Sequence, residues 1–386
     1  MSPIGAVPSP WMDEELEMLD RSVERFLAQK MPPERLAKWR ADGIVERAAW
    51  AEAAQAGLLG VSIAEEFGGA GGDFRHEAVL IRRLGLIGAE GWSIPLHNTI
   101  CAPYIANHGT AEQKRRWLPR MVSGELIAAI AMTEPGAGSD LQGIRTTARA
   151  DGDEYVISGQ KTFISNGQLA DLIIVVVKTD PSAGSRGVSL IVVETKGAAG
   201  FQRGRNLDKI GLEMGDTSEL FFDEVRVPKE NLIGMNPGQG FYQLMQELPK
   251  ERLMIALESD ALIEYALLVT LDYVKERHAF GKRLLDFQNT QFKLAECKTE
   301  ATIARVFTDE CIRRCCAGTL DAATASMAKY WVSDLAQKIV DTCQQLFGGY
   351  GYMNEYPIAQ MYKDVRVKRI YGGANEIMKM LIARTL

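Results

Sequence analysis

Residues 131–140 read AMTEPGAGSD, a glycine-rich stretch that lies where the pattern of the chain changes. Before it, from Asp13 to about Leu126, apolar residues recur at helical spacing. After it, as far as Pro228, short β-rich runs alternate with turn residues, and beyond Gly240 long amphipathic patterns return. This order predicts an α+β protein of three domains. They are an N-terminal α-helical domain (1–128), a middle β-barrel or sandwich domain (129–236) and a C-terminal four-helix bundle (237–386).

The most distinct local predictions are four strands and two helices. Apolar runs bounded by Gly, Pro, Asp and Ser predict strands at Tyr155–Ser158, Leu172–Lys178, Val188–Glu194 and Leu220–Val227. Helical periodicity predicts helices at Glu46–Ala56 and Glu112–Val122. The glycine-rich stretch therefore stands at the entry to the predicted sheet.

The composition is that of an ordinary globular protein. The chain has 386 residues, of which 46% are hydrophobic and 24% charged, with a net charge of −6. No dense Lys/Arg block occurs, so a nucleic-acid partner is not expected. No apolar run approaches the roughly 20 residues of a membrane span, and Met1–Trp11 lacks the basic and apolar segments of a secretory signal. We therefore expect a cytoplasmic protein that binds neither nucleic acid nor membrane.

The six cysteines and four histidines do not form a metal-binding pattern. Neither a CxxC pair nor an HExxH motif occurs. Cys311 and Cys315 lie four residues apart in a helical stretch, which would suit a metal pair or, as we expect for all six cysteines, apolar core packing. We predict no metal.

On chemistry alone, residues 131–140 have two interpretations. The free N–H groups and hydroxyls of such a turn suit an anion or the edge of a ring. The stretch equally suits a plain connection between a helical domain and a sheet domain. Residues 136–141 come near the dinucleotide fingerprint GxGxxG, but Leu141 stands where the last glycine belongs. The residues alone leave both interpretations open.

A resemblance to a known family favours the first interpretation. The stretch AMTEPGAGSD is similar, almost letter for letter, to the signature of the acyl-CoA dehydrogenases, flavoenzymes that desaturate acyl thioesters. The resemblance covers nearly the whole chain. It implies that Met132 and Thr133 contact the isoalloxazine of FAD and that Ser139 approaches the cofactor and the acyl-CoA. The segment QKTFISN at 160–166 resembles the family's second flavin segment, which implies ring contacts from Phe163, Ile164 and Ser165.

Two later segments resemble the regions that bind the rest of FAD. In ERHAFGK at 276–282 and FQNTQ at 287–291, the resemblance implies contacts commonly made across a subunit interface, from Arg277, Phe280, Phe287, Gln288 and Gln291. The residues Leu284, Phe287, Gln288 and Gln291 have helical spacing, so we expect them on one helical face, which alone would also suit core packing. QLFGG resembles the loop over the adenosine half and implies contacts from Gln345, Leu346, Phe347, Gly348 and Gly349.

The tail motif YGGANE at 371–376 opens the predicted last helix. The resemblance implies cofactor contacts from Ala374, Asn375 and Glu376, and Asn375 also suits the N-cap of that helix. Ala374 stands where relatives usually have threonine, so one hydroxyl contact to the cofactor is lost. Phe163 replaces a tryptophan found in several relatives, and stacking on the flavin is retained.

The family's reaction requires a base that takes the α-proton of the thioester while the β-hydride passes to flavin N5. Many members carry this carboxylate where the present chain has Gly372. The long-chain and isovaleryl branch carries it where the chain has Glu251, in the segment MQELPKERL at 245–253. Gly372 would retain a second task, because its N–H would polarise the thioester carbonyl. Glu247 and Glu376 are alternative carboxylates.

Burial in an apolar acyl channel would raise the pKa of Glu251 toward working pH. A competing interpretation is that Glu251 is a surface carboxylate paired with Arg252 or a nearby lysine. Within this motif we favour the role of base.

The resemblance also implies the substrate and the partners. Contacts to acyl-CoA are expected from Ser139, Tyr242, Arg252 and Gly373. The expected assembly is a homotetramer, a dimer of dimers, that passes electrons to an electron-transfer flavoprotein in fatty acid β-oxidation. The region around Glu251 leans toward long straight chains over short branched ones. An oxidase, or a catalytically silent flavin- or acyl-CoA-binding protein, is the alternative, and the carboxylate at Glu251 favours an active dehydrogenase.

Overall fold

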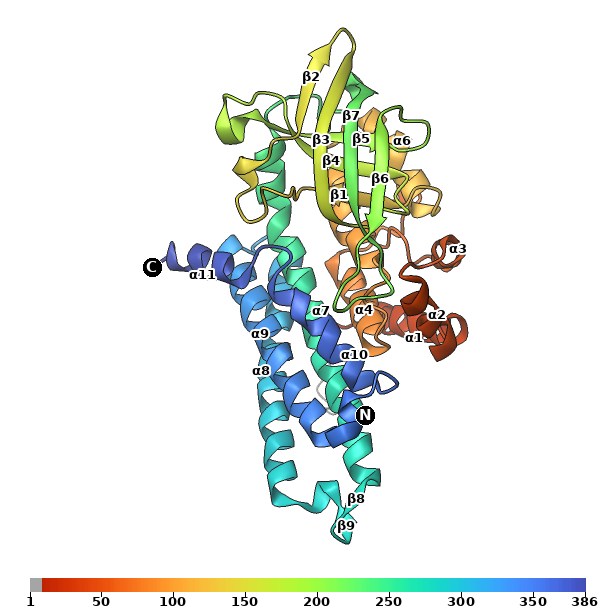
Figure 1. The fold of residues 1–386 in the computed structure, drawn as a ribbon, viewed down its shortest axis with the longest axis vertical. Coiled ribbons are helices and arrows are strands. Elements are labelled where there is room, and N and C mark those ends of the chain that lie inside the picture. Colours follow the sequence, from red (N-terminus) through yellow and green to blue (C-terminus); the bar gives the residue numbers. More distant parts are fainter. Residues whose placement is uncertain (1–8) are drawn as a thin grey trace.

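The computed structural model describes residues 9–386, and its helices and strands follow the predicted helix–sheet–helix order (Figure 1). The interpretation of Met1–Trp11 as lacking a secretory signal falls mainly on residues 1–8, outside the described part. No helix within residues 9–386 is both long enough and apolar enough to cross a membrane.

The N-terminal region is built from six α-helices with two short helical turns between them. Asp13 caps the first helix, and Thr110 and Gln113 form a capping box at the last one. The predicted helices at 46–56 and 112–122 are confirmed as α3 and α6. The elements are α1 (Glu14–Lys30), α2 (Pro33–Asp42), α3 (Arg47–Gln55), η1 (Glu65–Phe67), α4 (Phe74–Leu86), the π-helix η2 (Leu96–Cys101), α5 (Ala102–His108) and α6 (Ala111–Val122).

The middle region is one curled sheet of seven strands within the described residues. The strands are β1 (Ala128–Ala131), β2 (Thr147–Asp151), β3 (Glu154–Ser165), β4 (Leu172–Lys178), β5 (Val188–Glu194), β6 (Phe201–Asn206) and β7 (Thr217–Pro228). All four predicted strands are confirmed. The sheet order is β1-β4-β2-β3-β7-β6, and β5 pairs with β4. The short helical turns are η3 (Leu141–Gly143), η4 (Gly184–Gly187) and η5 (Lys229–Asn231).

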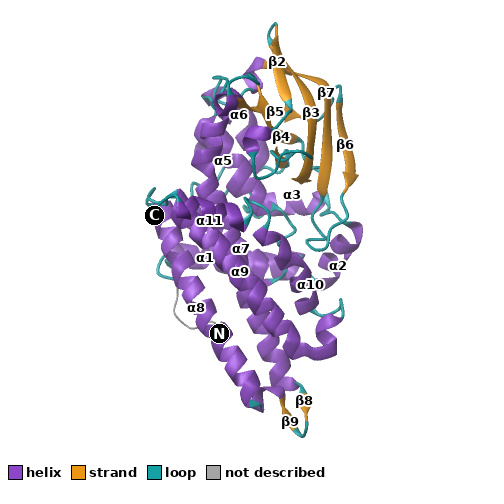
Figure 2. Cartoon of the chain, turned by 60° about the vertical axis from the view of Figure 1, so that its left-hand side comes forward, coloured by secondary structure: helices purple, strands orange, loops and turns teal. Residues whose placement is uncertain are grey.

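Strand β4 is buried on both faces. Leu172, Ile174 and Val176 belong to the core shared with the helical regions, whereas Ile173 and the other alternate residues pack inside the curled sheet. Double burial explains the unbroken apolar run of this strand. It also joins the sheet to the helices as one packed body, with helices against one side of it (Figure 2).

The C-terminal region is a bundle of three long helices with two shorter ones. These are α7 (Gly240–Glu276), α8 (Gln288–Cys316), α9 (Ala322–Phe347), α10 (Pro357–Asp364) and α11 (Asn375–Ala383). Between them lie β8 (His278–Ala279), β9 (Lys282–Arg283), η6 (Leu284–Asp286), η7 (Gly348–Tyr352) and η8 (Val365–Arg369). Figure 1 shows α7 running from the sheet to the β8–β9 hairpin at the opposite end of the molecule.

Three local predictions were wrong. Helix α8 begins at Gln288, so Leu284 and Phe287 precede it and do not share a continuous helical face with Gln291. Ala374 is the N-cap of α11, because Asn375 is already helical and its side chain bonds to α9. Cys316 is exposed rather than packed in the core. Among the described residues, no group of three or more His, Cys, Asp and Glu side chains could hold a metal ion.

Candidate active site

Glu251 is the twelfth residue of α7, and it is 4% exposed. The hydroxyl of Tyr104 donates a hydrogen bond of 2.7 Å to its Oε1. Burial raises the pKa of Glu251 to about 7, although the bond from Tyr104 acts in the opposite direction. A carboxyl with this pKa can both take and release a proton near neutral pH.

Arg252 does not pair with Glu251 at the surface, so that interpretation was wrong. The guanidinium of Arg252 is itself buried, and its Nη1 lies 3.5 Å from the hydroxyl of Ser326. Its Nε has no hydrogen-bond partner among residues 9–386. Arg252 is thus a buried side chain next to Glu251 in the sequence, and burial lowers the pKa of its guanidinium although the charge of Glu251 acts in the opposite direction.

The alternative carboxylates are differently placed. Glu247, one turn before Glu251, accepts hydrogen bonds from Asn107 Nδ2 at 2.8 Å and from His108 Nε2 at 3.0 Å. Burial would raise the pKa of Glu247, but the bonds from His108 and Asn107 outweigh it and hold this pKa below its ordinary value. Glu247 is therefore the more acidic of the two carboxyls. Glu376 lies exposed in the first turn of α11.

The tail motif meets α7 one turn after Glu251. Gly372 has φ +63°, and a Cβ placed on it would lie 2.2 Å from Cδ1 of Ile255. The next residue, Gly373, has φ +93° and accepts a 2.7 Å hydrogen bond from Lys329 Nζ at its carbonyl. Contact with Ile255 therefore brings Gly372 beside the α7 segment that carries Glu251.

The first residues of α11 are held by α9. Lys329 also bonds Asn375 Oδ1 at 2.9 Å, and Asn375 Nδ2 donates to Ser333 and Asp334. Asn375 is 1% exposed, so its side chain serves the loop that carries Gly372. Burial lowers the pKa of Lys329 to about 8.

The two expected flavin segments lie side by side at the edge of the sheet. The N–H of Thr162 donates to the carbonyl of Thr133 at 2.9 Å. Lys161, fully buried, bonds the carbonyl of Met132 at 3.0 Å and Glu134 at 2.8 Å, which fixes the turn that begins at residue 131. Glu134 in turn accepts N–H groups from residues 145 and 146. The turn is therefore rigid.

Phe163 stands out on this edge because its ring is 67% exposed and its φ is +60°. An exposed aromatic ring on a strained backbone suits a site that stacks on a planar ligand. The neighbouring Ile164 is buried in the sheet, and Ser165 is half-buried. Ser139 is exposed in the turn, and Tyr242, 61% exposed, lies at the start of α7. The exposed ring of Phe163 and the turn beside it fit the face and edge of a flavin ring.

A second set of expected cofactor residues gathers at the far end of the bundle. A cavity of about 510 Å³ is lined by Arg277, Leu284 and residues 345–350, among others. Tyr273 stacks on Phe347 at 4.1 Å between ring centroids, and the guanidinium of Arg277 lies over Tyr350 at 5.4 Å. A Cβ at Gly348 or Gly349 would meet no atom within 4 Å. The cavity offers a cation, open glycine backbone and aromatic rings, which fit a nucleotide.

Near this cavity, three aromatic or amide residues are open to contact. Phe280 is 95% exposed and has φ +52°, while Gln288 and Gln291 are exposed on the first turn of α8. Phe287 is half-buried and lies edge-on to Phe280 at 6.3 Å. This end of the bundle therefore presents the exposed ring of Phe280 and the two amide side chains to solvent.

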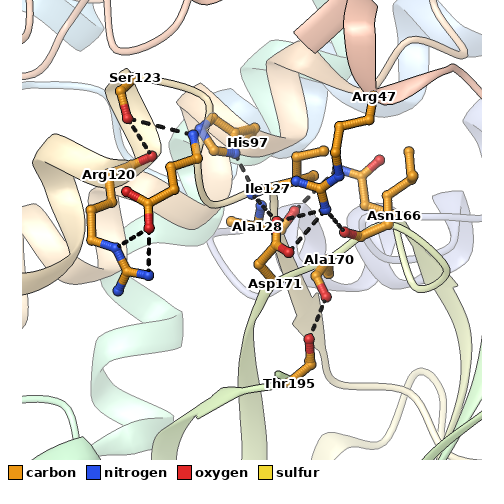
Figure 3. A network of polar contacts seen from close by, with 12 residues as sticks. Arg47, His97, Arg120, Ser123, Ile127, Ala128, Asn166, Ala170, Asp171 and Thr195 are labelled. Atoms are coloured by element: carbon orange, nitrogen blue, oxygen red, sulfur yellow. Dashed lines mark hydrogen bonds and ion pairs between the residues drawn. The ribbon is translucent and has the colours of Figure 1, made fainter. Parts of the chain in front are cut away.

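A polar network ties the π-helical turn η2, which directly precedes α5, to the sheet (Figure 3). His97 Nδ1 accepts the N–H of Ala128 at 3.1 Å, so its Nε2 donates to the carbonyl of Met121 at 3.2 Å. Burial lowers the pKa of His97 to about 4, so the ring is neutral. Asp171, from the start of β4, accepts from the N–H of Ile127 and from Arg47.

Sequence reasoning missed Tyr104, Ile255 and Lys329. Tyr104 is 147 residues from Glu251, and nothing in the local pattern around either residue marks the pair. Lys329 had one available signal, since a lysine in an apolar stretch of a predicted helix must find a partner when buried. Ile255 carries no signal, because an isoleucine one turn after the base is ordinary core packing.

Comparison with known proteins agrees with these arrangements. Residues 13–125, 129–225 and 238–386 match the N-terminal, middle and C-terminal domain models of acyl-CoA dehydrogenase. The mitochondrial long-chain specific acyl-CoA dehydrogenase of Sus scrofa is 48% identical over 96% of the chain and 86% of its own length. The mitochondrial isovaleryl-CoA dehydrogenase of Solanum tuberosum is 35% identical over 85% and 80%. A crystal structure of acyl-CoA dehydrogenase from Geobacillus kaustophilus is 47% identical, with a TM-score of 0.95 over 98% of this chain and 99% of that one.

The chain therefore belongs to the acyl-CoA dehydrogenase family. It is a FAD-dependent oxidoreductase that acts on the CH–CH group of acyl-CoA thioesters in fatty acid oxidation. The predicted family, fold, enzyme class and cofactor are confirmed.

Proposed function

We propose that Glu251 is the base that removes the α-proton of an acyl-CoA, giving the trans-2-enoyl-CoA. The observation that carries the proposal is the meeting of the Glu251 segment with the Gly372 loop across Ile255. Burial of Glu251 and its pKa of about 7 support the role, because a carboxyl with this pKa is partly ionised at neutral pH and its carboxylate form can accept a proton. Glu247, held ionised by His108 and Asn107, is the weaker base of the two.

The second task belongs to the backbone of the tail loop. Negative charge develops on the thioester oxygen as the α-proton leaves, and an oriented N–H stabilises it. We assign this donor to Gly372, whose left-handed conformation is pinned between Ile255 on one side and the Lys329-bound carbonyl of Gly373 on the other. Bound FAD supplies the hydride acceptor at its N5.

The remaining assignments follow from the same arrangement. Met132, Thr133, Ser139, Phe163, Ile164 and Ser165 would hold the flavin ring, and Ala374, Asn375 and Glu376 would lie near it. Arg277, Phe280, Phe287, Gln288, Gln291 and the loop Gln345, Leu346, Phe347, Gly348 and Gly349 would hold the nucleotide half. Ser139, Tyr242, Arg252 and Gly373 would contact acyl-CoA. The domain boundaries at 128/129 and 236/237 complete the proposal.

The two expected cofactor-binding sets lie at opposite ends of α7, with the flavin segments on the sheet and the nucleotide cavity at the far end of the bundle. Glu251 and Arg277 are separated by 26 residues of α7, which at the rise of an α-helix is about 39 Å. We therefore propose that each FAD lies between two subunits, in a homotetramer built as a dimer of dimers.

We propose a long straight-chain acyl-CoA as substrate, on the strength of the 48% identity to the long-chain specific enzyme of Sus scrofa. Electrons would pass to an electron-transfer flavoprotein. A cytoplasmic location is supported by the six cysteines, all of which are free thiols, as expected in a reducing compartment.

Anaerobic titration of the purified holoenzyme with acyl-CoAs of graded length and branching tests the proposal. Loss of flavin absorbance is expected, most completely with long straight chains. Glu251→Gln should retain FAD and acyl-CoA but bleach slower by several orders of magnitude, since loss of a catalytic base removes the proton-transfer step.

Glu247→Gln is the matched control, one turn away on the same helix. It should bleach within about tenfold of the wild-type rate, because general-base catalysis is typically worth 10²–10⁴-fold and this residue does not supply it. Unchanged bleaching in Glu251→Gln would move the base elsewhere. The absence of bleaching with every acyl-CoA tested would contradict the assignment as an active dehydrogenase.

A further inference from the structure

Tyr104 and Glu251 form a buried side-chain pair that the reaction scheme above leaves unused. The tyrosine hydroxyl donates to Glu251 Oε1 at 2.7 Å, and Tyr104 is 0% exposed. The two residues come from different regions, α5 and α7, so the bond crosses from the N-terminal helices to the bundle. We propose that Tyr104 is a positioning residue, whose hydroxyl holds the carboxylate of Glu251 in one orientation and stabilises its ionised form. The inference rests on the proposed role of Glu251 as base.

The scaffold under Tyr104 is held rigidly. Tyr104 is the third residue of α5, directly after the π-helical turn η2, in which the N–H of Ala102 reaches the carbonyl of His97. π-helical turns occur mostly as single turns and often at functional sites. Pro103, at the junction, has no N–H to donate, which suits the departure from the regular α pattern.

Each polar side chain of the π-helical turn is bonded to another element. His97 joins the start of β1 and the end of α6. Asn98 accepts from the N–H of Gly60 at 3.1 Å and donates to the carbonyl of Leu58 at 2.9 Å. Thr99 donates to the buried Glu77 at 3.4 Å. These bonds fix the turn against four neighbouring segments, so the Tyr104 hydroxyl is presented at a defined place.

The bond has a direct consequence for the base. A free glutamate side chain has several rotamers, and holding one of them removes a geometric barrier to proton transfer. Because Tyr104 engages Oε1, the second oxygen, Oε2, is left to receive the proton. The phenol keeps its own proton and so cannot act as the base, since burial and the neighbouring Glu251 raise its pKa well above the ordinary value.

The electrostatic effect of Tyr104 can be separated from those of its neighbours. The groups that act on Glu251 are Glu247, Lys250 and Arg252 on α7, with Tyr104 on α5 opposite. Cys101, at the end of the π-helical turn, also faces Glu251. Burial and Glu247 favour the neutral carboxyl, whereas the Tyr104 bond, Arg252 and Lys250 favour the carboxylate. A bond donated to the ionised form lowers the pKa, so removing the hydroxyl must raise it.

Tyr104→Phe removes only the hydroxyl and tests the inference through the pH dependence of bleaching. The acid limb of the rate profile should move up by about one pH unit, because that shift corresponds to the loss of one good hydrogen bond to a charged group. Below the limb the variant should be slower than wild type by a further factor of about ten, and at high pH only the loss caused by a less well oriented carboxylate should remain. A role in packing alone would lower the rate equally at every pH.

A second readout needs neither substrate nor turnover. Infrared difference titration follows the C=O stretch of the protonated Glu251 carboxyl, identified as the band that Glu251→Gln lacks. In Tyr104→Phe this band should persist to higher pH than in the wild type. Tyr155→Phe is the matched control, since Tyr155 is a buried tyrosine of β3 in another region, and its profile should equal that of the wild type.

The outcomes separate this inference from the proposed function. If Glu251→Gln bleaches normally, the base is elsewhere and both ideas fail. If Glu251→Gln is inactive while the profile and the infrared band of Tyr104→Phe match those of the wild type, only the role of Tyr104 is refuted. A loss in Tyr104→Phe that is uniform in pH, with an unshifted band, refutes it as well. Thermal unfolding and FAD content are measured on each variant to identify any that fold poorly. For such a variant, the pH range over which the infrared band persists decides whether Tyr104 acts on Glu251.

Discussion

At the scale of single residues, a steric contact explains why the tail loop has no carboxylate at position 372. The chain has a carboxylate at 251 and none at 372, and the backbone at Gly372 leaves no room for one. Its φ of +63° disfavours any side chain, and Ile255 Cδ1 occupies the place of its Cβ. Glu251 and Ile255 are one turn apart on α7, so the helix that carries the proposed base also excludes a carboxylate from position 372 of the loop.

This steric argument predicts the stability of Gly372→Ala. Gly318, at the end of α8, has φ +67° and open space where a Cβ would stand, so Gly318→Ala bears only the backbone strain. Strain of that kind costs about 1–2 kcal/mol. Gly372→Ala should lose more than its control, because the methyl group also collides with Ile255.

Urea unfolding of the two variants, monitored by tryptophan fluorescence, measures the difference. Adding Ile255→Ala should recover part of the loss seen in Gly372→Ala after allowance for the cavity that Ile255→Ala itself creates. Equal losses in Gly372→Ala and Gly318→Ala would mean that the Ile255 side chain moves aside at little cost and does not exclude a side chain at position 372.

At the scale of elements, α7 organises the molecule. It carries Glu251 in its first half and ends at Arg277 beside the nucleotide-sized cavity. Between these points it is fixed by a buried ion network with α8, in which Arg305 bonds Asp260 at 2.6 Å and Glu264 at 2.7 Å. Asp260 is 0% exposed, and desolvation is the main cause that raises its pKa.

We expect Arg305→Leu to destabilise the bundle by about 3–5 kcal/mol, because removing one partner leaves a buried charge poorly compensated. Arg313→Leu on the same helix is the control. Arg313 pairs with Glu310 at 2.7 Å, but its side chain is 64% exposed, and exposed pairs contribute about 0–1 kcal/mol. Midpoints of thermal unfolding check the contrast. Similar midpoints for both variants would show that water reaches the α7–α8 network.

At the scale of the whole molecule, the separation between the two ends of α7 predicts active sites shared between subunits. Glu251→Gln lacks the base, and Arg277→Ala should lose the contact at the nucleotide end, so each homo-oligomer should be poorly active. In a mixed assembly, one shared site receives Glu251 from one subunit and Arg277 from the other. Co-expression of the two variants with different affinity tags, followed by tandem purification, should restore bleaching.

The shared-site prediction has a simple control. Mixing the two purified homo-oligomers without exchange of subunits should leave activity unchanged. If the tandem-purified mixed assembly is no more active than its parents, both cofactor sets act within one chain and the arrangement proposed for the tetramer is wrong.

The sequence determined those features that depend on neighbouring residues. The runs at Leu172–Lys178 and Val188–Glu194 coincide with β4 and β5, because strands buried on both faces have a nearly continuous apolar sequence. The family motifs and the segment around Glu251 are likewise local, which is why the enzyme class and the candidate base could be read without a structure. Errors fell at element ends, as at Phe287 and Asn375, where capping depends on the surroundings.

Only the tertiary structure decided how the site is assembled. The bond between Tyr104 and Glu251, the contact between Ile255 and the Gly372 loop, and the bonds from Lys329 all join segments more than 40 residues apart. No local pattern encodes such contacts, since they arise when packed helices bring distant side chains within a few ångströms. The candidate base could therefore be proposed from the chain, whereas the pKa and the bonding of Glu251 and the steric contact at Gly372 became visible only in the folded protein.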